Sequence, residues 1–342
     1  MKLNYLPNQY KKNKKIKINH SYLIEQFSDY KKIFHQIEKT VKRADYTLGE
    51  EVDKFEKNMS SRMKSKFTIS VGNGTDALFL VLKALNIGQG DEVITTPYTF
   101  YATIGAIVTA GAKPVFVDVD EDYNINVDKI ENKINKKTKA ILPVHWSGRI
   151  CNMKKIKMIS SKYEVPIVED ACHAISARYY KNFAGKFGDF GCFSLHPLKN
   201  LNVWGDGGFV IVKNKKQYQN LRLMRNHGLV SRNKNLIFGY NSRLDTIQAV
   251  VANHLLKKIK NITKKRIENS LYLEKRLKFL NGLIFKERSK HLVEVFHLYE
   301  FRLQNSKLRE PLVKYLRKNN IDAKIHYTIP MHLQPAAKKY SY

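Results

Sequence analysis

The chain has 342 residues, 43% of them apolar, with 19 Tyr and 17 Phe, which excludes a disordered polymer and predicts about two folded domains. Its 61 Lys and Arg outnumber 30 Asp and Glu, but apart from the basic run at 11–15 they are scattered, so we expect no nucleic-acid partner. No apolar run is long enough for a bilayer or a signal peptide, and the three cysteines lack metal-site spacing. We therefore expect a cytoplasmic protein with no membrane or metal association.

Residues 67 to 213 alternate short β-branched runs with longer amphipathic ones, such as the helical segments 75–85 and 152–163. The short runs are apolar throughout, which is typical of a parallel sheet covered on both faces. We therefore expect an α/β fold with a mostly parallel, seven-stranded central sheet. The predicted strands are 67–71, 92–96, 114–119, 139–145, 166–170, 190–195 and 208–212.

The pattern changes after Asn241. A long Lys-rich helix is predicted at about 244–280, followed by a strand at 293–302, a helix at 308–318 and a short strand ending near His326. This order predicts a smaller α+β domain beside the large one. We place the boundary between residues 1–254 and 255–342.

The first candidate site is the glycine-rich turn at 72–75, between a predicted strand and a predicted helix. The N-terminus of a helix offers free N–H groups and a positive dipole end, so Gly74 and Thr75 can bind an anion there. Thr75 can equally serve as the N-cap of the helix. The turn lacks the Gly-Lys-Ser/Thr of a Walker loop.

The second candidate site is the end of the predicted strand 166–170, where Glu169 and Asp170 are followed by His173. Open α/β sheets bind ligands at the carboxyl ends of their strands. A buried carboxylate there needs a cation. Asp170 either pairs with a protonated ring nitrogen of a cofactor or caps the next helix, and His173 either contacts the same ligand or is structural.

The third candidate site follows the predicted strand 190–195, where Ser194 and Lys199 lie in a polar turn before the glycines of 205–208. A lysine at a sheet edge among apolar neighbours loses solvation, which frees its amine for Schiff-base chemistry. In so Lys-rich a chain, an ordinary surface lysine is the competing interpretation.

The three sites fit one chemistry. Pyridoxal phosphate needs an amine for its aldehyde, a carboxylate for its ring nitrogen and a nest for its phosphate. Lys199, Asp170 and Gly74 with Thr75 and Ser194 supply these groups. The conjunction is far more specific than any single motif.

From about Tyr22 to its last residues, the chain resembles the DegT/StrS group of sugar aminotransferases, which have the fold type I architecture of aspartate aminotransferase. The resemblance rests on specific motifs in this sequence: GNGTDAL, GDEVITTPYTFYAT, GAKPVFVDVD, PVHWSGR, VEDACHA, GCFSLHPLKNL, GDGG, NHG and GYNSRLDTIQA.

The resemblance implies roles for matching residues. Lys199 is similar to the family's Schiff-base lysine, Asp170 to the partner of the pyridine nitrogen, and Phe100 to the aromatic ring that stacks on the cofactor. The remaining matches are Gly74, Thr75 and Ser194 to the phosphate binders, His173 to a residue near the ring hydroxyl, Asn241 to one that reaches the other subunit's phosphate, and His326 to one near the substrate mouth. The active unit would then be a homodimer.

The resemblance also implies the reaction: an amino acid, expected to be glutamate, gives its amino group to a ketone on a nucleotide-linked sugar. The residues 199–201 and 205–208 resemble enzymes that make 3-amino sugars more than those that aminate C4. Two alternatives stay open, an aminotransferase for a cyclitol ketone and a regulatory or nucleic-acid-binding protein on the same fold. Relatives continue past a segment like 332–335 whereas this chain stops at Tyr342, so we expect a truncated small domain.

Overall fold

The computed structural model describes residues 16–340 of the chain. The basic run at 11–15 and the chain's last residue, Tyr342, lie outside the described residues. Within residues 16–340, no helix has the length and apolar character needed to cross a bilayer. The same residues contain no group of three or more His, Cys, Asp or Glu side chains placed to hold a metal ion.

All seven predicted strands form, but hydrogen bonding divides them between two sheets. One sheet has the order β1-β9-β8-β5 and the other the order β3-β2-β4. They adjoin through two isolated parallel bridges, Ile141 to Ile167 and Val144 to Asp170. Only β9 runs antiparallel to its neighbours, so the arrangement is mostly parallel. The strands are β1 (Phe67–Val71), β2 (Glu92–Thr95), β3 (Lys113–Phe116), β4 (Thr138–Ile141), β5 (Val168–Asp170), β8 (Phe190–Ser194) and β9 (Gly208–Val212).

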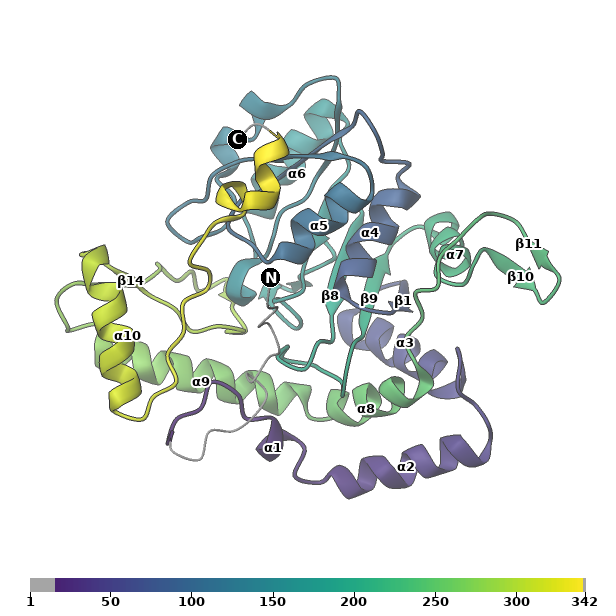
Figure 1. Ribbon diagram of the computed structural model, residues 1–342, viewed down its shortest axis with the longest axis horizontal. Helices are drawn as coiled ribbons and strands as arrows, with labels where there is room; N and C mark the ends of the chain where they lie inside the picture. Colours follow the sequence, from purple (N-terminus) through teal and green to yellow (C-terminus); the bar gives the residue numbers. More distant parts are fainter. Residues whose placement is uncertain (1–15, 341–342) are drawn as a thin grey trace.

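Two apolar clusters cover the two faces of the four-stranded sheet. Every residue of β9 is buried, and its side chains alternate: Phe209 and Ile211 join one cluster, Val210 and Val212 the other. The first cluster includes side chains of α3, α6 and α8, and the second those of α4, α5 and α7. The bounds are α3 (Glu50–Met63), α4 (Gly74–Ala84), α5 (Tyr101–Thr109), α6 (Met153–Tyr163), α7 (Lys215–Met224) and α8 (Thr246–Leu256). Figure 1 shows α4 and α5 on one side of β8 and β9, with α3 and α8 below them.

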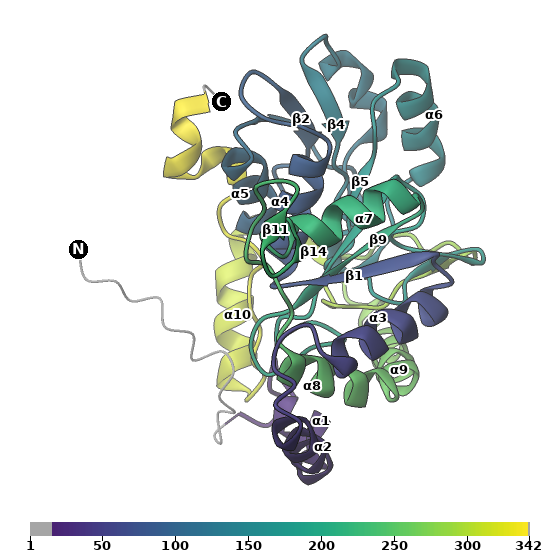
Figure 2. The ribbon, with the colours of Figure 1, turned by 90° about the vertical axis from the view of Figure 1, so that its right-hand side faces the viewer.

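Two segments lie at the edge of this body. The N-terminal helices α1 (Leu23–Gln26) and α2 (Tyr30–Lys42) run along the outside of α8 and α9 (Ile259–Leu277), as both ribbon views show (Figures 1 and 2). Between α7 and α8, the hairpin of β10 (Leu229–Ser231) and β11 (Lys234–Asn235) projects from the molecule (Figure 1). Just after this hairpin, Phe238 is 97% exposed.

The C-terminal third differs from the prediction in three elements: the long helix, the strand at 293–302 and the strand ending near His326. The long helix is interrupted after residue 256 and continues as α9 (Ile259–Leu277). At the interruption, Asp29 accepts a hydrogen bond from Lys258 at 2.5 Å and lies 3.0 Å from the His254 ring nitrogen. The helix 308–318 is present as α10 (Arg309–Lys318). The proposed domain boundary at 254/255 falls inside α8 and stays a prediction.

The predicted strand at 293–302 is wrong. Its two ends instead form separate two-residue strands, β13 (Leu292–Val293) and β14 (Arg302–Leu303). Between them, the N–H groups of Val295 and His297 donate to the carbonyls of Gly148 and Ser147 at 3.1 and 2.9 Å. The N–H groups that a strand would use for pairing are therefore bonded to the turn at 147–148 instead. The partners of β13 and β14 are β6 (Arg178–Tyr179), which also pairs with β7 (Asn182–Phe183), and β12 (Leu283–Ile284).

The predicted strand ending near His326 is also wrong. The only pairing of this stretch among the described residues is an isolated bridge from Ile321 to Ile18. The His326 carbonyl accepts a hydrogen bond from the Tyr98 hydroxyl instead of from a neighbouring strand. The segment is thus an extended connector held by side chains.

A buried ion pair joins three elements of the large body. Glu56 on α3 accepts hydrogen bonds from the Ser70 N–H at 2.9 Å, from the Ser70 hydroxyl at 2.8 Å and from Arg225. Arg225, just after α7, also donates to the Ser70 carbonyl at 2.7 Å. Both charged side chains are less than 10% exposed, so each charge depends on the other.

We expect Glu56→Ala to lower the free energy of unfolding by about 3–5 kcal/mol, because it leaves Arg225 buried without its counter-charge. Urea denaturation measures the loss. The matched control is Asp128→Ala, which breaks an exposed pair with Lys155 and should cost about 1 kcal/mol or less. Equal losses in the two variants would contradict this account of the buried pair.

Candidate active site

One cavity of about 600 Å³ opens at the carboxyl ends of β5 and β8. It brings together residues that are up to 307 positions apart in the sequence, from His20 to Tyr327. Eight of the nine candidate residues line it: Gly74, Thr75, Phe100, Asp170, His173, Ser194, Lys199 and His326. The ninth, Asn241, is exposed outside the cavity and forms a backbone bridge with Asn226.

The N-terminus of α4 forms one wall of the cavity. The N-cap is Asn73, whose side chain accepts the Asp76 N–H at 2.8 Å, so Thr75 is not the cap. The hydroxyl of the exposed Thr75 has no hydrogen-bond partner among the described residues and is available to a ligand. A Cβ on Gly74 would lie 2.7 Å from the Cβ of Ser194, so only glycine lets the helix start approach the end of β8 this closely.

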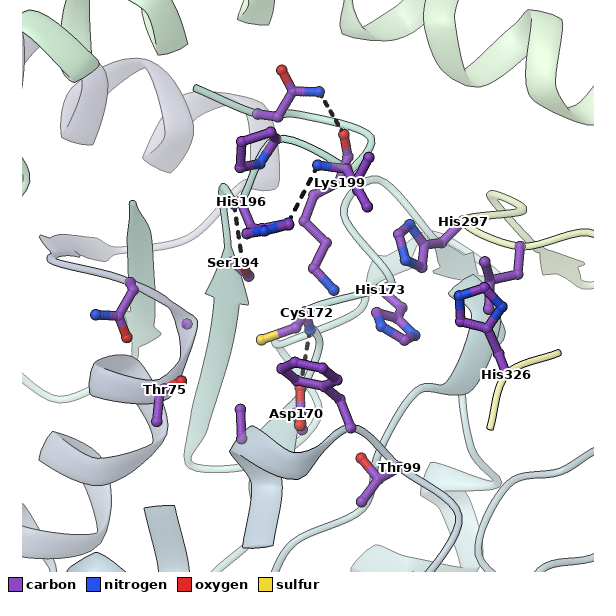
Figure 3. Close-up of a pocket in the computed structure, with 18 of the residues that line it drawn as sticks. Thr75, Thr99, Asp170, Cys172, His173, Ser194, His196, Lys199, His297 and His326 are labelled. Atoms are coloured by element: carbon purple, nitrogen blue, oxygen red, sulfur yellow. Dashed lines mark hydrogen bonds between the residues drawn. The ribbon is translucent and has the colours of Figure 1, made fainter. Parts of the chain in front are cut away.

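The two acids at the end of β5 have different surroundings, because successive side chains of a strand point to opposite faces. Asp170 faces the cavity, and its two oxygens accept the Thr103 hydroxyl at 2.8 Å and the Cys172 N–H at 3.2 Å. Thr103 itself lies 2.6 Å, hydroxyl to hydroxyl, from Thr99 (Figure 3 shows Thr99 below Asp170). The carboxylate is thereby oriented before any ligand binds.

Glu169 points away from the cavity and is fully buried. Its carboxylate accepts the backbone N–H groups of Gly185 at 2.7 Å and Gly188 at 2.5 Å, and lies 2.7 Å from Nε2 of the buried His145. All of its partners belong to the protein. Glu169 is therefore a structural residue, and only Asp170 is available to a ligand.

Lys199 lies in the loop between β8 and β9, and its side chain points toward Asp170 and His173 (Figure 3). Its backbone is fixed at both ends: the N–H donates to the His196 carbonyl, and the carbonyl accepts the Asn202 side chain, each at 2.8 Å. Asn202 in turn accepts a hydrogen bond from Gln26 of α1 at 3.1 Å. Burial lowers the pKa of the Lys199 amine, against the opposing attraction of Cys172 and Asp170. A lowered pKa increases the neutral, nucleophilic fraction of the amine.

Five histidines line the same cavity: His20, His173, His196, His297 and His326. Burial is the largest cause that lowers the pKa of each, and the Lys199 charge lowers it further for all except His20. The pKa of His326 falls to about 4. The rings of His173 and His297 lie 4.2 Å apart between Lys199 and His326. The cavity is thus lined with neutral imidazoles at neutral pH.

Three residues of the site were not predicted from the sequence: Thr103, His297 and His20. Thr103 could have been predicted from the sequence, because it lies one helical turn after Thr99, in a helix that begins just past the carboxyl end of β2. His297 was assigned to a strand, and His20 precedes the stretch in which any element was predicted. Neither histidine has a local pattern that places it at the cavity.

The cavity fits pyridoxal phosphate on its own geometry. It offers a helix N-terminus that no side chain obstructs at Gly74, the oriented carboxylate of Asp170 and the desolvated amine of Lys199. The model of the DegT/DnrJ/EryC1/StrS aminotransferase family matches residues 28–342. The chain belongs to this family. Its enzymes depend on pyridoxal phosphate, and their fold is the type I architecture expected from the sequence.

Relatives of this aminotransferase include a protein of Geobacillus stearothermophilus called a pleiotropic regulatory protein, 34% identical over 94% of this chain and 86% of that one. A dTDP-3-amino-3,6-dideoxy-alpha-D-galactopyranose transaminase of Aneurinibacillus thermoaerophilus is 38% identical over 85% of this chain and 79% of its own. Among solved structures, DesV of S. venezuelae in complex with a ketimine intermediate has a TM-score of 0.89 at 31% identity, covering 93% of this chain and 85% of its own.

We expect Glu169→Ala and Asp170→Asn to separate structural from ligand-binding roles in adjacent residues. Glu169→Ala leaves two buried N–H groups and His145 without their acceptor and should cost about 3–5 kcal/mol of unfolding free energy. Asp170→Asn keeps an acceptor oxygen and should cost less than about 1.5 kcal/mol, while changing the absorbance of bound pyridoxal phosphate. Urea denaturation and absorbance spectra report the two effects, and the reverse pattern would contradict the assignment.

We expect Gly74→Ala to weaken pyridoxal phosphate binding, because the added methyl pushes α4 and Ser194 apart at a cost of about 1–3 kcal/mol. Gly105→Ala on α5 is the control, since a Cβ there meets nothing within 4 Å and the helix gains propensity. Fluorescence titration with the cofactor measures both. Unchanged affinity in Gly74→Ala would exclude this wall as the phosphate nest.

Proposed function

We propose that this family member transfers the amino group of L-glutamate to the C3 ketone of a nucleotide-linked keto-deoxyhexose. The observation that carries the catalytic part is the convergence of the Lys199 amine, the Asp170 carboxylate and the open N-terminus of α4 on one cavity. The 3-amino sugar in the name of the Aneurinibacillus relative supports a C3 ketone, as do the residues 199–201 and 205–208.

Pyridoxal phosphate, when bound, supplies an aldehyde that takes up the amino group and a ring that accepts electrons from the donor's α-carbon. Gly74, Thr75 and Ser194 would hold its phosphate at the positive end of α4. Asp170, oriented by Thr103, would keep the ring nitrogen protonated. Phe100, which lines the cavity, and His173 would hold the ring from its face and its hydroxyl edge.

Lys199 is the residue proposed to move protons. Its amine, with a pKa lowered by burial, takes the proton from the α-carbon of the amino donor as a general base. Its conjugate acid would then give that proton to the C4′ position of the cofactor. In the second half-reaction the same amine would take a proton back from that position and deliver it to the sugar carbon that receives the amino group. Asn202 holds the backbone of Lys199 in place while the side chain swings between these positions.

A homodimer in the cytoplasm is part of the proposal. Asn241 lies outside the cavity of its own chain, in the surface segment that follows the exposed β10–β11 hairpin. Leu236 and Phe238 of this region are 58% and 97% exposed. A second copy packed against this surface would cover them and let Asn241 reach the phosphate site of its partner.

The intact pair of Lys199 and Asp170 favours an enzyme over a regulatory or nucleic-acid-binding protein on this fold, although one relative bears a regulatory name. A panel of keto substrates, nucleotide-linked sugars with the ketone at C3 or C4 and a cyclitol ketone, separates the remaining candidates. Mass spectrometry of the aminated product is the readout.

We expect Lys199→Ala to abolish turnover, and borohydride reduction of the wild-type holoprotein to attach the cofactor covalently to Lys199. Peptide mass spectrometry locates the attachment. Lys186→Ala is the control, because burial also lowers the pKa of Lys186 but its amine binds the Lys64 carbonyl outside the cavity. Reduction of a cofactor-loaded protein without a label on Lys199 would refute the proposed function.

A further inference from the structure

Arg266 on α9 lines the cavity, yet it has no role in the proposed chemistry. Its Nε donates to the Tyr22 hydroxyl at 2.9 Å, and its Nη1 donates to the carbonyls of Phe296 at 2.9 Å and His297 at 3.3 Å. These neutral acceptors orient the guanidinium without balancing its charge. Within residues 16–340, Arg266 has no carboxylate partner and its Nη2 has no hydrogen bond.

The surroundings of Arg266 carry excess positive charge. Arg266 contributes to the lowered pKa of His20 and of His297, after burial in both cases. The His20 ring stacks on His326 at 5.6 Å, and Lys324, which also lowers the pKa of both, is 3.3 Å from Asp322. Asp322 is the one carboxylate that raises the pKa of His20, so a single acid faces two permanent cations here.

This end of the cavity is distinct from the proposed phosphate site. Figure 3 places His326 and His297 on the opposite side of Lys199 from Thr75. The carboxylates that line the cavity are Asp76, Asp170 and Asp206. Asp76 accepts a hydrogen bond from Ser242, and Asp170 accepts one from Thr103. The charge of Asp206 acts to raise the pKa of His196. None of the three is paired with Arg266.

We propose that Arg266, with His20 and His326, forms a second anion subsite that binds an oxyanion group of a substrate while the cofactor's phosphate occupies the start of α4. This subsite rests on the proposed function and deepens it. A partly desolvated guanidinium without a counter-charge is costly, and the planar fork matches carboxylate and phosphate oxygens. The neutral imidazoles of His20 and His326 can donate further hydrogen bonds to the same anion.

Two substrate groups have this chemistry, the carboxylate of the amino donor and the diphosphate of the nucleotide sugar. Isothermal titration of the holoprotein with glutarate tests the first, and titration with uridine diphosphate tests the second. Neither ligand can turn over, so the readout is binding and not activity.

We expect Arg266→Gln to weaken binding of one of the two ligands about tenfold or more, since a hydrogen bond to a charged group is lost. Arg266→Lys, which keeps the charge without the fork, should lose less. Arg62→Gln is the control: Arg62 is half-buried on α3, away from the cavity, and its loss should leave both affinities unchanged. The ligand that is weakened identifies the group that the subsite binds.

The absorbance of lysine-bound cofactor separates two kinds of failure. A wild-type protein that binds no cofactor at Lys199 refutes the proposed function. A cofactor-loaded Arg266→Gln protein with wild-type affinity for both glutarate and uridine diphosphate overturns the subsite alone. If Arg266→Gln loses its circular-dichroism spectrum, His20→Leu takes its place: affinity within twofold of wild type for both ligands overturns the subsite, and a larger loss for one supports it.

Discussion

The two-residue repeat of strand β5 is the constraint on which both the stability and the chemistry of this protein depend. It places adjacent acids on opposite faces of the sheet, so that one carboxylate is consumed by the fold and the other is left for a ligand. The Glu169 carboxylate links the strand to the turn at 185–188 and to His145 through hydrogen bonds. Asp170, one peptide further on, is held ready by Thr103 at the floor of the cavity. A shift of one residue in the register of β5 would exchange these roles and destroy both.

The central part of the fold could be predicted because its signals are local. Short β-branched runs between amphipathic segments gave all seven strands, and the carboxyl-end rule brought Gly74, Asp170 and Lys199 to one place. The errors fall where tertiary contacts override local preference. Residues 293–302 read as a strand, but Val295 and His297 bond to the 147–148 turn, and the segment near His326 is anchored by Tyr98. Sequence patterns do not reveal such partners, because these lie more than a hundred residues away.

The same distinction applies to the site. Residues in motifs at strand ends were found. By contrast, His20 comes from the N-terminal segment, His297 from an irregular stretch, and Arg266 from α9, which contributes no other residue to the lining. The electrostatics follow from this assembly: a lysine, an arginine and five imidazoles share a desolvated space with few acids, so the proton affinity of each imidazole is lowered. An anionic ligand would restore part of it, and ligand binding would take up protons from solvent.

The hydrogen bonds from Gln26 to Asn202 and from Asn202 to the Lys199 carbonyl connect the first helix of the described chain to the loop of the reactive amine. Energetic coupling through such a connection acts in both directions. Whatever immobilises the Lys199 loop also protects α1 from local opening, and a protease that nicks the chain near residue 26 would cut the ligand-free protein faster than the loaded one. The rate of that cleavage would then report whether the cavity is occupied.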